Sequence, residues 1–360
     1  MKITFVTLMA SQNGGNRVIS IYAKKLIDMG HEVHIISRQP QPQNALRKAK
    51  AWAQGAPKHD KDYTLFFDEI GAGHLLLPWK VPLEASDVPD ADVIIATQWR
   101  TAFEVSALPA SKGKKAYFVQ HHEVHEHLPW DLSRGTYFLP LKKITIADWL
   151  VETMEREYGD TDVVKIENSV DTEQFNAPER ARNAVPTVGF LYSKTPFKGV
   201  DISLKAIEIA RQTFPDLRVV AFGAGDPAPD LPLPENSEYH KSPQQDALRD
   251  LYAKCDVWLC GSRAEGFHLP PSEAMACRCP VVATRVGGTV EIITEGENGH
   301  LVEVNDFKGL AAGLISVLER SPDAWRAMSD AAHKRVNSYT WDDAARAFES
   351  ALQDVAASDM

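Results

Sequence analysis

The sequence has little of what membrane-spanning and nucleic-acid-binding proteins need. None of its apolar runs approaches the ~18 residues of a membrane-spanning helix, and the longest are short stretches such as Val93–Ala96. Positive charge is scarce, because 39 Lys and Arg stand against 49 Asp and Glu, which gives a formal net charge of −10. A chain this acidic lacks the basic surface that binding to a phosphate backbone requires, so general nucleic-acid binding is excluded.

Cysteine is also rare, and the sequence gives no sign of a secretion signal. The segment Met1–Leu8 has too short an apolar core for a signal peptide, so we expect a strand there and a cytoplasmic protein. The cysteines contain no Cys-x2-Cys pair, which argues against a zinc knuckle and favours reduced thiols. The four are Cys255, Cys260, Cys277 and Cys279.

Short β-branched runs alternate with helical stretches, which is typical of parallel α/β domains. A polar segment, residues 168–186, separates two such series and is a candidate linker. We therefore expect two α/β domains of similar size with a cleft between them, and a last helix from about 342 to 355. The expected strands are Ile3–Leu8, Glu32–Ser37, Val93–Ala96, Ala116–Val119, Ile144–Ile146, Thr187–Leu191, Leu217–Phe222, Val257–Cys260 and Pro280–Ala283.

Two glutamates, Glu265 and Glu273, stand eight positions apart in the most informative stretch. On one continuous helix they would be separated by ~12 Å, too far to share a small ligand. Gly266 and the prolines at 270 and 271 instead favour a loop followed by a helix. We therefore expect Glu265 on the loop after strand 257–260 and Glu273 in the first turn of the helix, where both can reach one ligand at the carboxyl edge of a sheet.

The amides of Phe267, His268 and Leu269 would point at an anion at the start of this helix. Carboxylates that accept from hydroxyls, next to amides that donate to phosphate, predict a site for a sugar nucleotide. The alternative is that Glu273 is only a helix-start glutamate favoured by the helix dipole.

These residues resemble a known family. The sequence E-G-F-x-L-P-x-x-E-A-M-A from Glu265, followed by Pro280–Thr284 and Gly287-Gly288, is similar to the retaining glycosyltransferases of family 4, which have the GT-B fold. The resemblance extends over nearly the whole chain. It also includes Gly14-Gly15, Gly30–Val33, Asn168–Phe175, Lys198-Gly199, Asn298-Gly299 and Tyr339–Trp341.

The resemblance implies an α/β GT-B architecture with two Rossmann-like domains. Residues 1–167 would form the acceptor-side domain and residues 168–338 the domain that binds the nucleotide sugar. Residues 339–360 would form a helix that returns to the first domain.

The resemblance also implies the donor and the site residues. The donor would be a UDP-, GDP- or dTDP-linked sugar, and no cofactor would be required. Glu273 would hold the ribose hydroxyls, Glu265 the transferred sugar, and Lys198 the charge on the leaving diphosphate. The other candidates for donor contact are Gly14, Gly15, Ser193, Lys194, Gly223, Gly266, Phe267, His268 and Leu269.

The sequence departs from the family pattern at three positions. Ser193 stands where the family usually has an arginine, His268 stands in place of the last glycine of E-G-F-G, and Arg278 replaces a glycine. The first two departures bear on which donor binds, since a serine or a neighbouring lysine (Lys194) cannot reproduce the planar fork of an arginine.

Four histidines lie in residues 121–127, directly after an expected strand. The spacing contains no His-Glu-x-x-His, so we expect no metal site, and a metal cluster remains the alternative. The resemblance implies that one histidine of this loop contacts the donor sugar, and we favour His122 over His121. The expected catalytic residues are then His122, Lys198 and Glu265.

We expect a retaining transferase that acts on a saccharide or lipid-linked saccharide, in the synthesis of surface polysaccharide or glycoconjugates. A basic amphipathic stretch at 44–52 is compatible with peripheral contact at the inner face of a membrane, or with a solvated surface helix. The rival functions are a non-hydrolysing sugar-nucleotide 2-epimerase and a silent sugar-nucleotide-binding subunit. The oligomeric state is left open.

Overall fold

The computed structural model describes residues 1–9, 13–39, 66–68, 70–78, 82–125 and 129–358. The chain divides into two compact units. Unit 1 comprises Met1–Thr145, Leu150–Ile166 and Ala345–Met360, and unit 2 comprises Ile146–Trp149 and Glu167–Ala344. The basic stretch at 44–52 lies outside the described residues.

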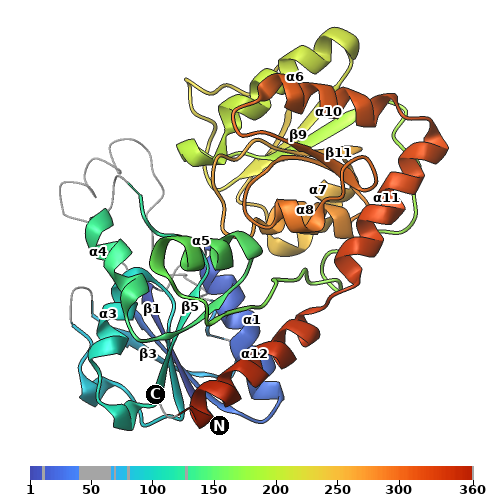
Figure 1. The fold of residues 1–360 in the computed structure, drawn as a ribbon. Coiled ribbons are helices and arrows are strands. Elements are labelled where there is room, and N and C mark those ends of the chain that lie inside the picture. The colour runs from blue at the N-terminus through green and yellow to red at the C-terminus, as the bar shows by residue number, and fades with distance from the viewer. Residues whose placement is uncertain (10–12, 40–65, 69, 79–81, 126–128, 359–360) are drawn as a thin grey trace. The chain divides into compact units, whose positions relative to one another are not determined.

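Unit 1 contains a seven-stranded parallel sheet with the order β3-β2-β1-β4-β5-β6-β7 (Figure 1). The central strand β1 pairs Phe5 with Ile35 of β2 on one side and with Ile95 of β4 on the other, and all three side chains are fully buried. Such apolar runs are typical of strands that are covered on both faces. The elements of unit 1 are β1 Lys2–Met9, α1 Gly14–Asp28, β2 Glu32–Arg38, β3 Gly73–Leu77, η1 Ala85–Asp87, β4 Val93–Ala96, α3 Trp99–Ala107, η2 Ala110–Lys112, β5 Lys114–Val119, α4 Trp130–Gly135, η3 Thr136–Phe138, β6 Lys142–Thr145, α5 Asp148–Tyr158, β7 Val163–Lys165 and most of α12 Trp341–Ala357.

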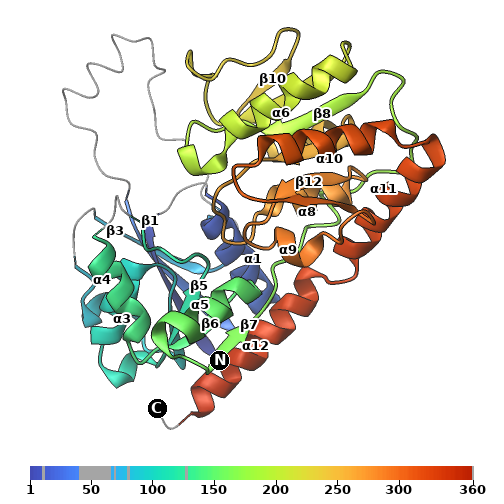
Figure 2. The same cartoon turned by 45° about the horizontal axis from the view of Figure 1, so that its top comes forward.

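Unit 2 contains a six-stranded parallel sheet with the order β10-β9-β8-β11-β12-β13 (Figure 2). Helices α6 and α10 pack against each other and bury the apolar residues of the sheet, among them Phe190 and Leu259. The elements of unit 2 are β8 Thr187–Leu191, η4 Pro196–Lys198, α6 Val200–Thr213, β9 Arg218–Gly223, β10 Glu238–Lys241, α7 Gln245–Ala253, β11 Val257–Cys260, α8 Leu269–Ala276, β12 Val281–Thr284, α9 Thr289–Ile292, β13 Gly299–Val302, α10 Phe307–Glu319 and α11 Pro322–Asn337.

Helix α12 ends the described chain, and its residues from Ala345 onward belong to unit 1. Phe348 is fully buried there among three aromatic rings. Its centroid lies 4.4 Å from that of Tyr22, 5.2 Å from that of Phe118 and 6.2 Å from that of Phe5. A segment at the end of the sequence therefore completes the core formed by β1, α1 and β5.

The α/β class predicted from the sequence is confirmed, and the strands Val93–Ala96, Thr187–Leu191 and Val257–Cys260 have the predicted bounds. Four strands were not predicted from the sequence, namely β3, β7, β10 and β13, and they are the edge strands of the two sheets. Strand β10, with the sequence EYHK, lacks the apolar pattern by which a strand is recognised, whereas β3, β7 and β13 contain apolar stretches of only two or three residues. The polar segment 168–186 has no helix or strand and lies within unit 2.

The four cysteines are buried free thiols. Among the described residues, no helix is long and apolar enough to cross a membrane. Within the same residues, no group of three or more His, Cys, Asp or Glu side chains is arranged to hold a metal ion.

Candidate functional site

The candidate site of unit 2 lies where the strand order of its sheet reverses. The chain passes from β8 to β9 on one side, and from β11 to β12 and β13 on the other. In open parallel sheets, ligands bind at the carboxyl ends of the strands at such a point, because the two connecting loops diverge there. Lys198 follows β8, and Glu265 follows β11, which pairs with β8. The topology therefore brings together two residues that lie 67 positions apart in the chain.

Two glycines allow the loops after β8 and β11 to meet. Gly199 has a left-handed conformation with φ +58°, and a Cβ atom added to it would lie 1.7 Å from the carbonyl oxygen of Gly261. A Cβ on Gly261 would in turn lie 2.7 Å from the carbonyl oxygen of Gly199. Only glycine fits both positions, and this is the physical reason for the Lys198-Gly199 pair.

Lys198 and Glu265 form an ion pair in which the ammonium nitrogen contacts both carboxylate oxygens. The Nζ–Oε1 distance is 2.9 Å and the Nζ–Oε2 distance is 2.8 Å. Ser262 Oγ donates to Glu265 Oε1 at 2.7 Å. Burial of the carboxyl opposes its ionisation, but the contacts with His268, Lys198 and Ser262 outweigh it, so the pKa of Glu265 lies below its usual range. Glu265 is therefore a buried carboxylate that is charged at neutral pH.

Arg263 fixes the loop that carries Glu265. Its guanidinium donates two hydrogen bonds to Asp201, at 2.9 and 2.7 Å, and a further one to the carbonyl oxygen of Pro196 at 2.6 Å. Its backbone amide donates to the carbonyl oxygen of Phe197. These contacts attach the loop after β11 to η4 and to the start of α6, and so they hold Lys198 near Glu265.

His268 lies at the start of α8 and adopts a conformation that glycine would adopt more easily. Its φ is +76°, which costs an L-residue roughly 1–2 kcal/mol. The ring is buried, with Nε2 3.5 Å from Glu265 Oε1. Burial lowers the pKa of His268 to about 4, with Lys198 acting in the same direction and Glu265 in the opposite one. The imidazole is therefore neutral at pH 7.

The position of Glu273 corrects one sequence-based prediction. We expected it in the first turn of the helix, but α8 begins at Leu269, so Glu273 is the fifth residue and lies in the second turn. The helix begins earlier than expected because His268 is its N-terminal cap and the two prolines lie in its first turn. Glu273 is buried, and Tyr252 Oη donates to its Oε2 at 2.7 Å. The dipole of the helix terminus acts mainly on the first turn, so it does not explain a glutamate here.

The remaining candidates of unit 2 lie at the same edge of the sheet. Ser193 is partly exposed and accepts from the amide of Thr195, and Lys194 is exposed. Gly223 ends β9, and a Cβ there would lie 2.4 Å from the carbonyl oxygen of Tyr192. Gly266 and Phe267 continue the loop, and the carbonyl oxygen of Phe267 accepts from the amide of Gly288. Leu269 begins α8, where the first amides of a helix have no partner within it.

Arg278, the third departure from the family pattern, has a left-handed backbone with φ +60°. Its Nε donates to the carbonyl oxygen of Ala177, and its NH1 contacts Asp330. The position therefore has the conformation for which glycine is favoured, and the side chain of this arginine is held by α11 and by segment 168–186.

The candidates of unit 1 lie after β1 and β5. Gly14 and Gly15 form the first turn of α1, and the carbonyl oxygen of Gly15 accepts from Gln120 Nε2 at 3.3 Å. His122 Nε2 lies 2.6 Å from Tyr158 Oη. Burial lowers the pKa of His122, with Glu157 opposing it. Nδ1 of His121 contacts the carbonyl oxygen of His122 at 3.0 Å.

Glu123, the next residue of this histidine loop, forms no ion pair with a lysine or arginine among the described residues. Its Oε2 accepts from the amide of Trp99, at the start of α3, at 2.7 Å. Its own amide donates to Tyr137 Oη at 2.8 Å. Burial raises the pKa of Glu123 to about 7, although the hydrogen bond from the amide of Trp99 acts against it. Residues 126–128 of the loop lie outside the described residues.

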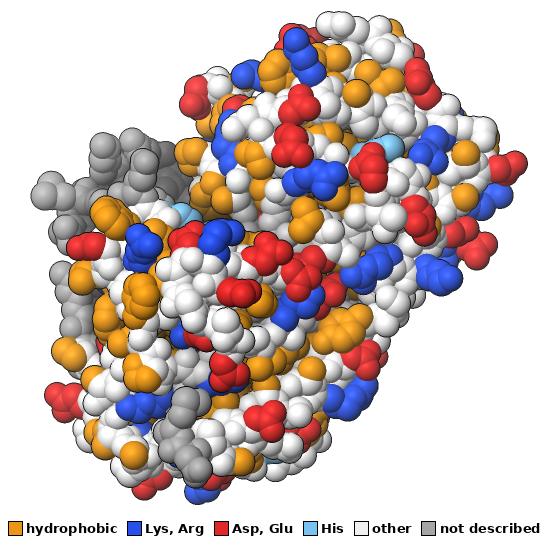
Figure 3. Space-filling model, in the orientation of Figure 1, with side chains coloured by type: hydrophobic (Ala, Val, Ile, Leu, Met, Phe, Trp, Pro, Cys, Tyr) orange, Lys and Arg blue, Asp and Glu red, His pale blue; other side chains and the backbone are white. Residues whose placement is uncertain are grey.

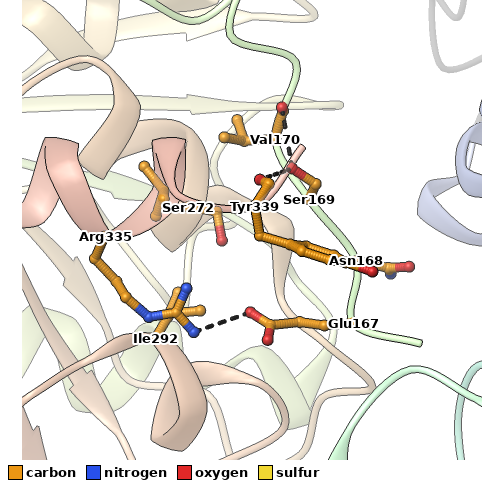
Figure 4. Close-up of a pocket in the computed structure, with 9 residues that line it drawn as sticks. Glu167, Asn168, Ser169, Val170, Ser272, Ile292, Arg335 and Tyr339 are labelled. Atoms are coloured by element: carbon orange, nitrogen blue, oxygen red, sulfur yellow. Dashed lines mark hydrogen bonds and ion pairs between the residues drawn. The ribbon is translucent and has the colours of Figure 1, made fainter. Parts of the chain in front are cut away.

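Unit 2 also contains a small pocket that is lined in part by Ser272, the residue of α8 before Glu273 (Figure 4). Glu167 and Arg335 form an ion pair of 3.1 Å at this pocket, and Ser169 Oγ donates to the carbonyl oxygen of Tyr339 at 2.7 Å. Lys198, Glu265 and Glu273 are not among the residues that line it. The residues that line this pocket come partly from the segment that begins at Glu167 and partly from the segment that precedes α12.

The structure thus brings Lys198, Glu265 and His268 together in unit 2, and it places His121, His122, Gly14 and Gly15 in unit 1. Three residues of the site were missed by the sequence analysis. Ser262 donates a hydrogen bond to Glu265, Arg263 donates to Asp201, and Tyr252 donates to Glu273. Ser262 and Arg263 lie three and two positions before Glu265, so their proximity in the sequence was a usable signal. Tyr252 is brought close to Glu273 only by the packing of α7 on α8.

Comparison with known proteins gives a family and a fold. Residues 171–335 match the family described as glycosyl transferases group 1. Phosphatidyl-myo-inositol mannosyltransferase of Mycolicibacterium smegmatis is 32% identical over 217 residues, which are 55% of this chain and 53% of that protein. The alignments with the first three curated relatives span 24%, 55% and 53% of their own lengths, so the chain matches about half of them or less.

Solved structures match over nearly the whole chain. Sucrose-phosphate synthase from Thermosynechococcus elongatus has a TM-score of 0.76 at 16% identity, and the match covers 98% of both chains. HepE of Anabaena, in complex with UDP-glucose, has a TM-score of 0.72 at 16% identity and covers 99% of this chain and 100% of its own. At these identities the similarity establishes the fold, and it confirms the predicted GT-B fold.

Proposed function

We propose that this chain, whose residues 171–335 belong to the glycosyl transferases group 1 family, transfers a sugar from a nucleoside-diphosphate sugar to a saccharide hydroxyl with retention of configuration. The observation that carries the proposal is the ion pair of Lys198 with buried Glu265 at the reversal point of the unit 2 sheet. A buried carboxylate next to a lysine offers acceptors for sugar hydroxyls and a cation for phosphate within one site.

In the proposed reaction, Lys198 leaves Glu265 and contacts the diphosphate of the donor. The bond between the anomeric carbon and the diphosphate oxygen breaks, and the negative charge that develops on the leaving oxygen is stabilised by Lys198 and by the amides from Gly266 to Leu269. The acceptor oxygen attacks the same face of the sugar, and its proton passes to the leaving phosphate oxygen. This order of events retains the configuration and needs no nucleophile from the protein.

Glu265 and Glu273 have separate roles in the proposal. Glu265 accepts from hydroxyls of the transferred sugar, and Glu273 accepts from both ribose hydroxyls. The assignment of donor contact to Gly14, Gly15 and the histidine loop of unit 1, with His122 favoured over His121, stays a prediction from the sequence. Ser193, Lys194 and Gly223, which lie at the same edge of the sheet as Lys198, contribute to the binding of the diphosphate and the base.

The donor proposal is tested by thermal shift with UDP-, GDP- and dTDP-sugars, since a ligand at 100 times its Kd adds about 2.7 kcal/mol of stability. With the sugar nucleotide that binds, the Glu273→Gln variant should lose about 1.5–3 kcal/mol of binding free energy, because one charge-assisted acceptor is removed. Tyr252→Phe is the matched control, since it removes the hydrogen bond to Glu273 and leaves the carboxylate. An unchanged donor Kd in Glu273→Gln contradicts the assignment.

The reaction type is tested by product analysis in excess EDTA. We expect the nucleoside diphosphate to be released when an acceptor is present, since Lys198 and the amides supply the positive field that a metal would otherwise provide. Conversion of the donor to its 2-epimer without an acceptor would instead identify an epimerase. Loss of transfer in EDTA with recovery on adding Mn²⁺ or Zn²⁺ would contradict metal independence.

We further propose that the acceptor is lipid-linked and that unit 1 contacts the cytoplasmic face of an anionic membrane. Orange side chains gather over α3 and α4 in Figure 3. The exposed apolar residues are Phe103 of α3, Trp130 and Leu132 of α4, and Phe138 of η3, which follows α4 directly. Arg100 and Arg134 are exposed on the same two helices, and a mixture of aromatic and basic side chains favours anionic lipid surfaces.

This contact is tested by sedimentation with phosphatidylglycerol vesicles and with phosphatidylcholine vesicles. Trp130→Ser should weaken binding to the anionic vesicles several-fold. Val304→Ser, which changes an exposed apolar residue of unit 2, is the control. Equal sedimentation of the wild type and Trp130→Ser contradicts the proposed surface.

A further inference from the structure

His268 combines two unfavourable features that distinguish it from its neighbours. Five non-glycine residues in the described chain have a positive φ, and among them only His268 is buried. Its Nδ1 is also buried and has no hydrogen-bond partner among the described residues. Strained backbone and an unsatisfied buried polar atom both lower stability, and together they are typical of residues kept for function.

Among the described residues, the charged groups that act on His268 are Glu265 and Lys198, and both follow strands of the unit 2 sheet. Glu265 comes from the loop after β11 and lies 3.5 Å away, and Lys198 comes from η4 and contacts both oxygens of Glu265. With a neutral imidazole, the three side chains together carry no net charge. The ammonium of Lys198 is the group that balances Glu265 in this arrangement, and Ser262 adds a neutral hydrogen bond.

A sugar nucleotide disturbs this balance, because its diphosphate is doubly anionic and competes with Glu265 for Lys198. A buried carboxylate that loses its cation needs another one, since an unpaired buried charge is costly. His268 Nε2 already lies next to Glu265 Oε1, and protonation gives the ring a second N–H donor.

We propose that His268 takes up one proton from solvent when a nucleoside-diphosphate sugar binds, and that its imidazolium then replaces Lys198 as the cationic partner of Glu265. The proton adds to the unprotonated ring nitrogen, and no covalent bond of the donor changes in this step. Lys198 is thereby released to the diphosphate while Glu265 remains charged. This inference rests on the proposed function, since it requires that the site binds a sugar nucleotide.

The proposal predicts that donor affinity depends on pH in a defined direction. In the free protein the pKa of His268 is about 4, and in the complex the neighbouring charges of Glu265 and the diphosphate raise it. Because the complex then binds more protons than the free protein, affinity increases as the pH falls. Between the pKa of His268 in the free protein and its pKa in the complex, the Kd for the donor should decrease about tenfold for each unit by which the pH falls. The sugar nucleotide itself does not titrate in this range, because its diphosphate is fully ionised.

The experiment is isothermal titration of the full chain with UDP-glucose, or with whichever UDP-, GDP- or dTDP-sugar gives the largest thermal shift. Titrations at pH 7 in phosphate and in Tris, whose ionisation enthalpies differ, give the number of protons taken up. We expect about one proton for the wild type and close to none for His268→Gly and His268→Asn. The glycine variant suits the left-handed backbone, so it keeps the test informative if the asparagine variant folds poorly.

His300→Asn is the matched control, because His300 also lies 2.6 Å from a glutamate, Glu295, in unit 2 but away from Lys198. This variant should take up protons as the wild type does. Donor binding without proton uptake by the wild type, or with equal uptake in the His268 variants, overturns the inference and leaves the proposed function intact. Absence of binding by every sugar nucleotide overturns the proposed function itself.

Discussion

Two carboxyl groups of this chain, buried Glu265 and partly buried Glu123, have pKa values shifted in opposite directions because their partners differ. Glu265 has Lys198 on both oxygens and Ser262 on one, and its pKa lies below the usual range even though burial opposes ionisation. Glu123 accepts from the backbone amide of Trp99, and burial raises its pKa to about 7. Contacts with cationic and hydrogen-bonding side chains therefore lower the pKa of Glu265, whereas burial prevails at Glu123.

The role of Lys198 is tested by its removal. Its charge matters most as negative charge develops on the leaving diphosphate, so Lys198→Ala should lower kcat by roughly 10²–10³ at saturating donor, and not only raise KM. Lys205→Ala, which removes a lysine of α6 that lies over Phe307, should leave kcat unchanged. A Lys198→Ala variant with the wild-type kcat would exclude this lysine from catalysis.

The raised pKa of Glu123 predicts a pH-dependent stability of unit 1. Between about 4.5 and 7 the unfolded chain releases this proton and the folded protein keeps it, so stability falls as the pH rises through that range. Glu123→Gln stays neutral, so from pH 5 to 8 it should lose about 1–3 kcal/mol less stability than the wild type.

This difference is measured by hydrogen exchange of the β5 amides at several pH values. Glu152→Gln changes an exposed glutamate of the same unit and should follow the wild type. Parallel pH profiles for Glu123→Gln and the wild type would show that Glu123 titrates normally.

At the scale of elements, the site depends on how the loop after β8 meets the loop after β11. Gly199 and Gly261 let the two backbones approach, and Arg263 holds them together through Asp201 and Pro196. Neither loop has a core of its own. The approach of the two backbones therefore sets the position of Lys198 relative to Glu265.

This dependence predicts a large effect of Gly199→Ala. The new methyl group would overlap the carbonyl oxygen of Gly261, and the left-handed φ adds strain, so unit 2 should lose about 3 kcal/mol or more and donor binding should fail. Gly296→Ala separates the two causes, because Gly296 has φ +74° and nothing within 4 Å of its added Cβ. That variant should lose only about 1 kcal/mol. Equal urea midpoints for the two variants would show that the close approach is unimportant.

At the scale of the whole molecule, the chain forms unit 1 from segments at both ends of the sequence. Strand β1 begins at Lys2, and α12 ends at Ala357, yet Phe5 and Phe348 stack in one core. Unit 2 is nearly continuous, from Glu167 to Ala344. Unit 1 therefore cannot complete its core until the last helix has been added, whereas unit 2 needs only its own stretch of chain.

Phe348→Ala tests this division of the core. Removing a fully buried aromatic ring costs about 3–5 kcal/mol, so the β1 and β5 amides of unit 1 should lose protection from hydrogen exchange while those of β8 and β11 keep it. Phe190→Ala, in the core of unit 2, should give the reverse pattern. Loss of protection in both units from either variant would show that they unfold together.

Much of the fold and part of the site could be predicted from the sequence, and the reasons differ from residue to residue. The strand Val257–Cys260 is a continuous apolar run, so its bounds follow from local composition. The edge strand Glu238–Lys241 has no such run, because one of its sides lies at solvent. The helix position of Glu273 was misjudged by a turn, because a buried histidine with a positive φ precedes α8 and no local rule predicts that.

The sequence by itself determined the parallel α/β class, the resemblance to a family and the identity of the charged residues, because these depend on local pattern and residue type. Only the tertiary structure decided which charges meet. Lys198 and Glu265 are brought into contact by the adjacent pairing of β8 and β11 and by the approach of Gly199 to Gly261. Within the part of the chain that the structure describes, Glu123 has no cationic partner and His268 Nδ1 has no hydrogen-bond partner. Pairing and burial are properties of the folded chain, and they set the protonation states on which the proposed chemistry depends.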